Sequence, residues 1–308
     1  MNVVAFFNNK GGVGKTSLAY HIAYMMSELN LKTLAVDLDP QSNLSSMFLE
    51  DRRLLEIWSE SENAQSILQS IEPIRKGTGD IVPAPIESVS DRIGLIVGHP
   101  NISLFEDKLS ASWAKTLDRD EAAFRITTAF FRIVQTAAAN HQADVVLIDM
   151  GPNLGSVNRS ILLAASHFVI PVAADLFSLQ GLKNLGPVIS EWKTDWTSRL
   201  ERLPNRIDFP IPIQTMNPIG YISVMHTERN YRPVRAYQQW RDQIPGIYRE
   251  FVRDRLLSDM PEKDNDEIGT VRNYMSLMTM AQAARKTIFH LKAAAGDIGS
   301  HAKAETSY

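Results

Sequence analysis

The segment FFNNKGGVGKTS, residues 6–17, places Lys10 and Lys15 five positions apart among three glycines. An apolar run precedes it and a helical pattern follows it. Glycines let backbone N–H groups converge on an anion, and the helix amino terminus adds partial positive charge. Lys15 can then reach the β- and γ-phosphates of a nucleotide, and the Thr16 hydroxyl is placed to bind Mg²⁺. The candidate nucleotide-binding residues here are Lys10, Gly11, Gly12, Val13, Gly14, Lys15, Thr16 and Ser17.

This loop departs from the common phosphate-binding pattern G-x-x-x-x-G-K-[ST] at one position. The first glycine of that pattern falls on Asn9. Asparagine tolerates a left-handed backbone better than most residues, so the loop remains compatible with phosphate binding. The alternative interpretation is a glycine-rich turn that carries an exposed lysine.

Two aspartates lie at the end of the second predicted strand, which covers residues 32–40. Asp37 and Asp39 belong to the segment DLDPQ, residues 37–41. Alternation along a strand puts both side chains on one side. They would lie at the carboxyl end of a strand, where doubly wound sheets bind their ligands. The alternative is a helix cap that leads into residues 43–50.

A third aspartate ends the clearest buried strand, within DVVLIDMGPN at residues 144–153. Four apolar residues, 145–148, place Asp149 at the carboxyl end of that strand. An ionised carboxylate there is costly unless it faces a cation or hydrogen-bond donors, and Mg²⁺ with its waters would supply both. The alternative is an ordinary buried aspartate.

The segment KGGVGKT resembles the deviant Walker A motif of the ParA/MinD superfamily of ATPases. In that family the additional lysine, Lys10 here, is the signature residue. The resemblance implies that Lys10 reaches across a nucleotide-sandwich homodimer to the partner's phosphates. A second cation there would help to neutralise charge on the transferred phosphoryl group. The alternative for Lys10 is a solvated loop charge.

The acidic segments resemble further motifs of the same family. By this resemblance Asp39, in a switch I segment, orients or deprotonates the attacking water, and Asp37 holds a water of the Mg²⁺ shell. DVVLIDMGPNLG resembles a Walker B segment in which Asp149 supports the metal and Gly151 faces the γ-phosphate through its N–H. The implied cofactors are ATP and Mg²⁺. The implied catalytic residues are Lys10, Lys15 and Asp39, and the implied metal site consists of Thr16, Asp37 and Asp149.

The resemblance extends over most of the chain. Residues 169–185 and 276–291 resemble later family segments, whereas residues 51–140 and 200–270 match loosely. Residues 225–227, beginning with Met225, correspond to the position where family members contact adenine. Ordinary packing at a strand end explains them equally well.

The order of elements predicts an α/β fold with a doubly wound, mostly parallel sheet, as in P-loop NTPases. We expect one domain, residues 1–308, that is mainly helical from about residue 228 onward. The predicted strands cover residues 2–8, 32–40, 93–100, 144–153, 167–175 and 219–227, and the predicted helices cover residues 16–30, 51–76, 119–140 and 178–202.

Composition excludes several classes of protein. The 308 residues include no cysteine, which excludes disulfides, thiolate metal sites and cysteine nucleophiles. No run reaches the roughly 18 apolar residues of a membrane span, and the amino terminus lacks a secretory pattern. The carboxyl-terminal tail lacks an amphipathic basic face, so we expect no membrane partner and a cytoplasmic location.

A local cluster of arginines is a candidate DNA-binding site. The formal net charge is −3, so any such activity requires a local patch. Seven arginines and four acidic residues lie between residues 226 and 255, with tyrosines and a tryptophan interleaved. Nonspecific phosphate binding needs such a cluster, although a solvated helix face with salt bridges is equally compatible. The candidate DNA-binding residues are Arg229, Arg232, Arg235 and Arg241.

The sequence therefore predicts a ParA-type ATPase. Mg-ATP would close a homodimer, and slow hydrolysis would open it, driving partition of plasmid or chromosomal DNA or the positioning of a cargo. The implied partners are nonspecific DNA and a ParB-like or cargo adaptor protein, with nucleoid association if DNA is bound. One alternative is a positioning ATPase that acts on a protein assembly without DNA. Another is a metabolic ATP-dependent enzyme of the same superfamily.

Overall fold

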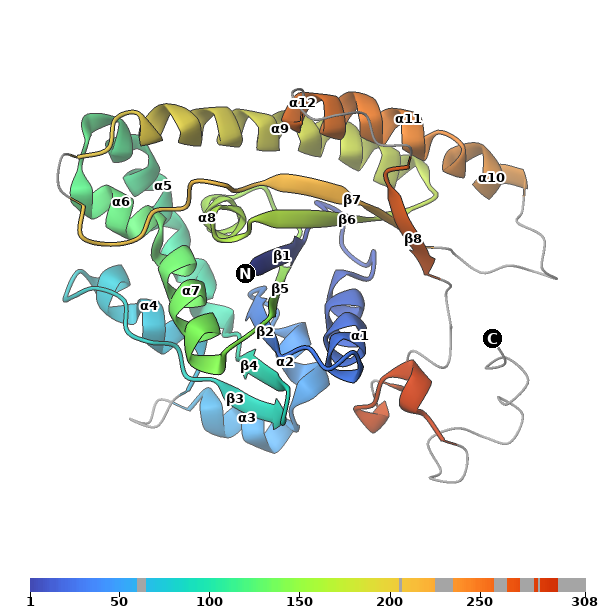
Figure 1. Cartoon of the computed structure of the whole chain (residues 1–308), viewed down its shortest axis with the longest axis horizontal. Helices are drawn as coiled ribbons and strands as arrows, with labels where there is room; N and C mark the ends of the chain where they lie inside the picture. Colours follow the sequence, from blue (N-terminus) through green and yellow to red (C-terminus); the bar gives the residue numbers. More distant parts are fainter. Residues whose placement is uncertain are drawn as a thin grey trace.

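The fold is built around one eight-stranded sheet with the strand order β3-β4-β2-β5-β1-β6-β7-β8 (Figure 1). The structure is a computed structural model, and it describes residues 1–59, 65–204, 207–224, 235–257, 265–271, 280–281 and 283–292. The strands are β1 (Asn2–Phe6), β2 (Thr33–Leu38), β3 (Glu87–Ser90), β4 (Ile93–Ile96), β5 (Val145–Met150), β6 (His167–Ala173), β7 (Asn217–Val224) and β8 (Glu267–Val271).

The sheet is parallel except at one edge. Strand β1 pairs in parallel with β5 and β6, and β2 pairs in parallel with β4 and β5. Only the pairing of β3 with β4 is antiparallel. The central strands are continuous apolar runs because both faces of a parallel sheet are covered. The predicted α/β fold with a mostly parallel sheet is confirmed.

Helices cover both faces of the sheet (Figure 1). Alternate residues of β5 enter different cores: Leu147 belongs to the core that includes α1, α2 and α3, whereas Ile148 belongs to the core that includes α4 to α9, α11 and α12. The α-helices are α1 (Lys15–Glu28), α2 (Asn43–Phe48), α3 (Asp51–Ile57), α4 (Ile67–Lys76), α5 (Glu106–Lys115), α6 (Glu121–Thr127), α7 (Ala129–His141), α8 (Ser156–Ala164), α9 (Leu176–Leu200), α10 (Arg235–Arg241), α11 (Ile244–Tyr248) and α12 (Asp254–Leu256).

Some element boundaries differ from the prediction. The helix expected over residues 119–140 is two helices, α6 and α7, which meet at Thr128. Strand β8 was not predicted, because the remainder of the chain was expected to be mainly helical. It is only five residues long, and its exposed and half-buried residues give a weak apolar signal. Its strand state comes from parallel pairing with β7, a contact between distant segments.

The carboxyl-terminal helices pack along α9 at the top of Figure 1. The π-helix Arg249–Arg253 joins α11 to α12. Gly186 of α9 makes this close packing possible, because a β-carbon at that position would lie 1.8 Å from the carbonyl oxygen of Phe251. Among the described helices, none combines the length and the apolar character needed to cross a bilayer.

We expect Gly186→Ala to lower the free energy of unfolding by about 1–3 kcal/mol, the usual cost of overpacking. The added methyl group meets a backbone carbonyl, which cannot rotate away. Gly246→Ala in α11 is the matched control, since nothing lies within 4 Å of its β-carbon position. Urea unfolding compares the two variants, and equal stabilities would contradict the close packing of α9 on the carboxyl-terminal helices.

Candidate nucleotide-binding site

The loop between β1 and α1 has the backbone of an anion-binding turn. Gly12 and Gly14 adopt φ values of 74° and 82°, which glycine accepts without strain. Helix α1 begins at Lys15, directly after Gly14. Asn9 does not have a positive φ. The ability of asparagine to adopt a left-handed backbone is therefore not required at this position. Asn9 instead lies against α9, where a β-carbon on Gly181 would be 2.8 Å from its Oδ1.

Lys15 is buried in this loop. Its Nζ donates hydrogen bonds to the carbonyl oxygens of Asn8 and Lys10, each at 3.2 Å. Burial lowers the pKa of Lys15, and the nearby carboxylates of Asp149 and Asp39 oppose this effect. The ammonium group therefore sits among loop carbonyls, with only neutral acceptors in direct contact. A phosphate oxygen would be a stronger acceptor than either carbonyl.

A cavity of about 650 Å³ opens in front of the loop. Its walls combine the loop with the turn after β2, helix α2 and the first residue of α3, the segment after β5, and residues 283 and 285. Its described lining residues are Gly11, Gly12, Gly14, Lys15, Thr16, Ser17, Asp39, Gln41, Asn43, Ser46, Met47, Asp51, Pro152, Ala283 and Arg285. This volume falls in the usual range for small-molecule sites.

Asp37 and Asp149 lie side by side behind this lining. They are register partners on the neighbouring strands β2 and β5, and both are fully buried. Burial raises the pKa of Asp37 to about 7, although hydrogen bonds from Ser45 lower it. The carboxylate of Asp37 accepts hydrogen bonds from the backbone N–H and hydroxyl of Ser45 and from the N–H of Asp39. Its oxygens therefore already have partners within the protein.

Asp149 has no such partners. Neither carboxylate oxygen has a hydrogen-bond partner of normal geometry, although both are buried. Burial raises the pKa of Asp149 well above its ordinary value, and the charge of Asp37 raises it further. The Thr16 hydroxyl and the Lys15 ammonium act in the opposite direction. An unsatisfied carboxylate beside a hydroxyl and an ammonium is an environment that a hydrated cation would complete.

The donor set fits Mg²⁺ bound together with a nucleotide. Thr16 and Asp149 offer oxygen atoms, which Mg²⁺ prefers. Within the described part of the chain, no three histidine or acidic side chains gather closely enough to hold a metal by themselves. The chain would therefore supply Thr16 and Asp149, and phosphate oxygens and water would supply the remaining ligands.

Asp39 and Gly151 face each other across the cavity edge. A β-carbon on Gly151 would lie 3.5 Å from Oδ1 of Asp39. That Oδ1 accepts a hydrogen bond from the N–H of Gln41, which fixes the carboxylate. The structure thus brings together the two residues assigned to the water and to the γ-phosphate.

Two side chains that the sequence analysis missed hold the loop after β5. The amide of Asn158 donates to the carbonyl oxygens of Gly151 and Asn153, at 2.8 and 2.6 Å. The carboxylate of Glu106, at the start of α5, accepts hydrogen bonds from the N–H groups of Ser156 and Val157 at the start of α8. No local sequence pattern marks either contact, because each joins segments that only the fold brings together.

Lys10 points away from this cavity and is bound within its own chain. Its Nζ lies 2.6 Å from Oδ2 of Asp175 and 3.4 Å from the hydroxyl of Ser178. The prediction that Lys10 serves the partner's nucleotide remains a prediction. Asp175 was also missed, although an acidic residue close to the end of an apolar strand, here two residues after β6, repeats the pattern of Asp39 and Asp149.

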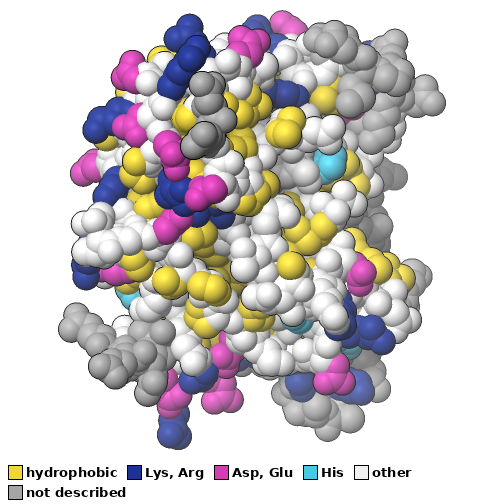
Figure 2. Space-filling model, turned by 60° about the vertical axis from the view of Figure 1, so that its left-hand side comes forward, with side chains coloured by type: hydrophobic (Ala, Val, Ile, Leu, Met, Phe, Trp, Pro, Cys, Tyr) yellow, Lys and Arg dark blue, Asp and Glu magenta, His cyan; other side chains and the backbone are white. Residues whose placement is uncertain are grey.

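Several predicted residues lie outside the described part of the chain. Met225, Arg229 and Arg232 do, and only the backbone of Arg235 is described. Arg241 is exposed on α10. The adenine and DNA assignments therefore remain predictions. On the face in Figure 2, basic and acidic side chains are interspersed and do not form a field of one sign.

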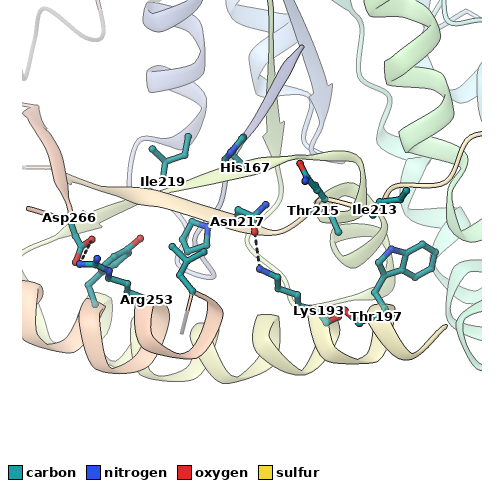
Figure 3. Close-up of a pocket in the computed structure, with 14 residues that line it drawn as sticks. His167, Lys193, Thr197, Ile213, Thr215, Asn217, Ile219, Arg253 and Asp266 are labelled. Atoms are coloured by element: carbon teal, nitrogen blue, oxygen red, sulfur yellow. Dashed lines mark hydrogen bonds and ion pairs between the residues drawn. The ribbon is translucent and has the colours of Figure 1, made fainter. Parts of the chain in front are cut away.

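A second cavity, of about 670 Å³, lies at the opposite end of the sheet (Figure 3). It is bounded by α9 and the amino-terminal ends of β6 and β7. The Nζ of Lys193 donates to Oδ1 of Asn217 and to the carbonyl oxygen of Leu256, and Arg253 pairs with Asp266. Its charged groups thus have partners within the protein, and it is remote from the glycine-rich loop.

A parallel sheet, a glycine-rich turn into α1 and acidic strand ends define a P-loop nucleotide-binding protein. Residues 1–202 match the family described as AAA domain, and the chain belongs to that family. Within it, the chain is a ParA-type member of the ParA/MinD superfamily, which confirms the resemblance.

Two curated relatives illustrate the similarity. Protein IncC from Escherichia coli is 29% identical over 263 residues, which cover 85% of this chain and 63% of that protein. The chromosome partitioning protein ParA from Myxococcus xanthus is 26% identical over 185 residues, covering 59% of this chain and 56% of that protein. The matches thus span less than two thirds of each of these two relatives.

Solved structures share the fold. Protein DIP2308 from Corynebacterium diphtheriae superposes with a TM-score of 0.75 at 25% identity, covering 92% of this chain and 97% of that one. A putative plasmid partition protein from Borrelia burgdorferi bound to AMPPNP superposes with a TM-score of 0.58 at 18% identity, covering 92% of this chain and 90% of that one.

The two buried carboxyl groups predict a pH-dependent stability of the nucleotide-free protein. Asp37 and Asp149 have folded-state pKa values raised above the ordinary 3.8, so the folded state binds their protons more tightly than the unfolded state. Their stabilising contribution is complete below about pH 4 and is lost as pH rises through the folded-state values. For Asp37 this window ends near pH 7.

We therefore expect Asp149→Asn to unfold at higher urea concentration than the wild type at pH 7. The advantage should shrink by up to about 1.4 kcal/mol for each pH unit as the pH falls toward 5. Asp118→Asn changes the same charge at an exposed position and is the matched control. A pH-independent difference between Asp149→Asn and the wild type would contradict the buried, unpaired carboxyl.

Proposed function

We propose that this chain is an ATPase in which Mg-ATP binding closes a homodimer and slow hydrolysis opens it. The observation that supports this proposal most directly is the buried carboxylate of Asp149, which lies beside Thr16 and Lys15 and has no hydrogen-bond partner of normal geometry. Such a group is expensive to maintain for stability alone, and a hydrated Mg²⁺ on a nucleotide would compensate it.

Each residue of the cavity has a distinct role in this proposal. Lys15, at the base of the cavity, would exchange its loop carbonyls for β- and γ-phosphate oxygens. The N–H groups of the glycine-rich loop would bind the same phosphates, and the N–H of Gly151 would meet the γ-phosphate. Bound Mg²⁺ would neutralise part of the phosphate charge. Asp39, fixed by the N–H of Gln41, would orient the attacking water or accept its proton.

The output of the switch is proposed to be partition of DNA or positioning of a cargo, in the cytoplasm. ParA from Myxococcus xanthus supports this assignment by family, and Arg229, Arg232, Arg235 and Arg241 are the candidate DNA-binding residues. Dimerisation would double that surface, which makes DNA binding dependent on ATP. A ParB-like or cargo adaptor protein would then stimulate hydrolysis.

Three single variants separate nucleotide binding, dimerisation and hydrolysis. Lys15→Ala should weaken ATP binding by about 10- to 100-fold, because it removes charge-assisted contacts with phosphate.

Lys10→Ala should bind ATP and stay monomeric, whereas Asp39→Ala should dimerise and fail to release phosphate. Calorimetry, light scattering and a phosphate assay measure the three properties. Normal ATP-dependent dimerisation of Lys10→Ala would rule out the sandwich dimer.

Retention on random-sequence DNA distinguishes the partition role from action on a protein assembly. We expect retention with a slowly hydrolysed ATP analogue, little with ADP, and a steep loss with rising salt, as phosphate contacts require. Arg241→Glu should reduce retention, with Arg119→Glu on the distant α5–α6 connection as the control. Absence of retention while the protein still dimerises would favour the alternative partner, a protein assembly.

A further inference from the structure

The signature lysine is held by an acidic residue of its own chain. The Nζ of Lys10 lies 2.6 Å from Oδ2 of Asp175, and the two side chains are only 31% and 25% exposed. Among the described residues that line the nucleotide cavity, Lys10 does not appear. Its charge is therefore directed toward the junction of β6 and α9 and away from its own nucleotide site.

Asp175 is fixed in position to receive this lysine. It is the amino-terminal cap of α9, and its Oδ1 accepts a hydrogen bond of 2.8 Å from the N–H of Ser178. The other oxygen, Oδ2, remains for Lys10 and for the hydroxyl of Ser178, which lies 3.3 Å away. Burial raises the pKa of Asp175, but the contacts with Lys10 and Ser178 together bring it below its ordinary value. The acceptor is thus charged and oriented by the helix that it caps.

The backbone around Lys10 is attached to the same junction. The amide of Asn8 donates to the carbonyl oxygen of Pro171 in β6, and its own Oδ1 accepts a hydrogen bond from the N–H of Lys10. Asn9 touches Gly181 in the second turn of α9. These contacts hold the loop against β6 and the start of α9. The backbone on both sides of the Lys10–Asp175 ion pair is therefore fixed, and the ion pair does not depend on a flexible side chain alone.

We propose that Asp175 is a positioning residue that holds Lys10 within its own protomer and competes for it with the phosphates of a partner's nucleotide. This inference rests on the proposed dimer. The ammonium group cannot leave the carboxylate for the partner's phosphates without breaking the 2.6 Å contact, so the contact opposes dimerisation. Exposed apolar side chains of Leu176 and Phe177 directly follow Asp175, and a second copy that approached Lys10 would cover them.

The expected size of the effect follows from the symmetry of a dimer. A partly exposed ion pair shifts an equilibrium by roughly threefold. Both protomers must release their lysine, so the dimer dissociation constant changes by about the square of that factor, or roughly tenfold. Asp175 would thereby set the protein concentration at which ATP closes the dimer.

The test uses the full chain with saturating magnesium and a slowly hydrolysed ATP analogue. Asp175→Asn removes the charge and keeps a side chain that caps helices well, as does Asp175→Ser. Sedimentation velocity over a range of protein concentrations gives the dimer dissociation constant. We expect both variants to dimerise about tenfold more tightly than the wild type, because neither offers Lys10 a carboxylate.

Three controls make the result specific. Asp195→Asn changes the same charge on the same helix, at an acid that pairs with Arg199, and should leave the dimer constant unchanged. Adding Lys10→Ala to Asp175→Asn should give the same monomer as Lys10→Ala alone, because the gain acts through the released lysine. Urea unfolding without nucleotide checks that each variant is folded, and Asp175→Ser replaces Asp175→Asn if the latter is not.

The outcomes separate this inference from the proposed function. If the wild type does not dimerise with the analogue, the proposed function fails. If the wild type dimerises while both Asp175 variants dimerise equally or more weakly, the proposed function stands and the competition by Asp175 is overturned. A gain that persists without Lys10 overturns it as well.

Discussion

The rest of the site depends on a carboxylate that the protein buries without a hydrogen-bond partner of normal geometry. Asp149 ends the central strand β5, between Lys15 and Thr16 on one side and Asp37 on the other. Its neighbours exclude water but do not satisfy its oxygens. A folded chain tolerates such a group either as a bound proton or as a charge facing a cation. The protonated form suits the empty cavity, and the ionised form suits a cavity that contains magnesium and phosphate.

Hydrogen bonds connect the protonation state of this buried pair to two segments, the one after β2 that contains Asp39 and the one after β5 that contains Gly151. Asp37 links the buried carboxyl pair to Ser45 and to the backbone of Asp39, so the segment after β2 is attached to the pair. Glu106 and Asn158 hold the segment after β5 from the other side. Residues between 51 and 140, for which the sequence offered no function, thus contribute through Glu106 to the position of the start of α8, the helix that carries Asn158. Short hydrogen bonds therefore connect the cavity to both segments, and in the proposed function they would carry the effect of the nucleotide to them.

The sequence predicted the parts of the site that local patterns encode. A glycine-rich turn between a strand and a helix, and acids at the ends of apolar runs, identified the loop, Asp39 and Asp149 because spacing alone determines those positions. The partners of Glu106, Asn158 and Lys10 could not be predicted, because each contact joins segments far apart in the chain. Strand β8 was missed for the same reason, since its state depends on pairing with β7. Lys10 shows most clearly what the sequence could not predict. Its position in the motif indicated the family, but its ion-pair partner, Asp175, could be identified only from the fold.

The most direct test of the central claim is proton release when the nucleotide binds. Calorimetric titration of the protein with ATP at pH 7 and excess magnesium, repeated in buffers of different ionisation enthalpy, counts the protons released. We expect net release of protons from the Asp37–Asp149 pair, and loss of most of that release in Asp149→Asn. Tight binding with no proton release, unchanged in Asp149→Asn, would contradict the claim that magnesium and a nucleotide compensate the buried carboxylate.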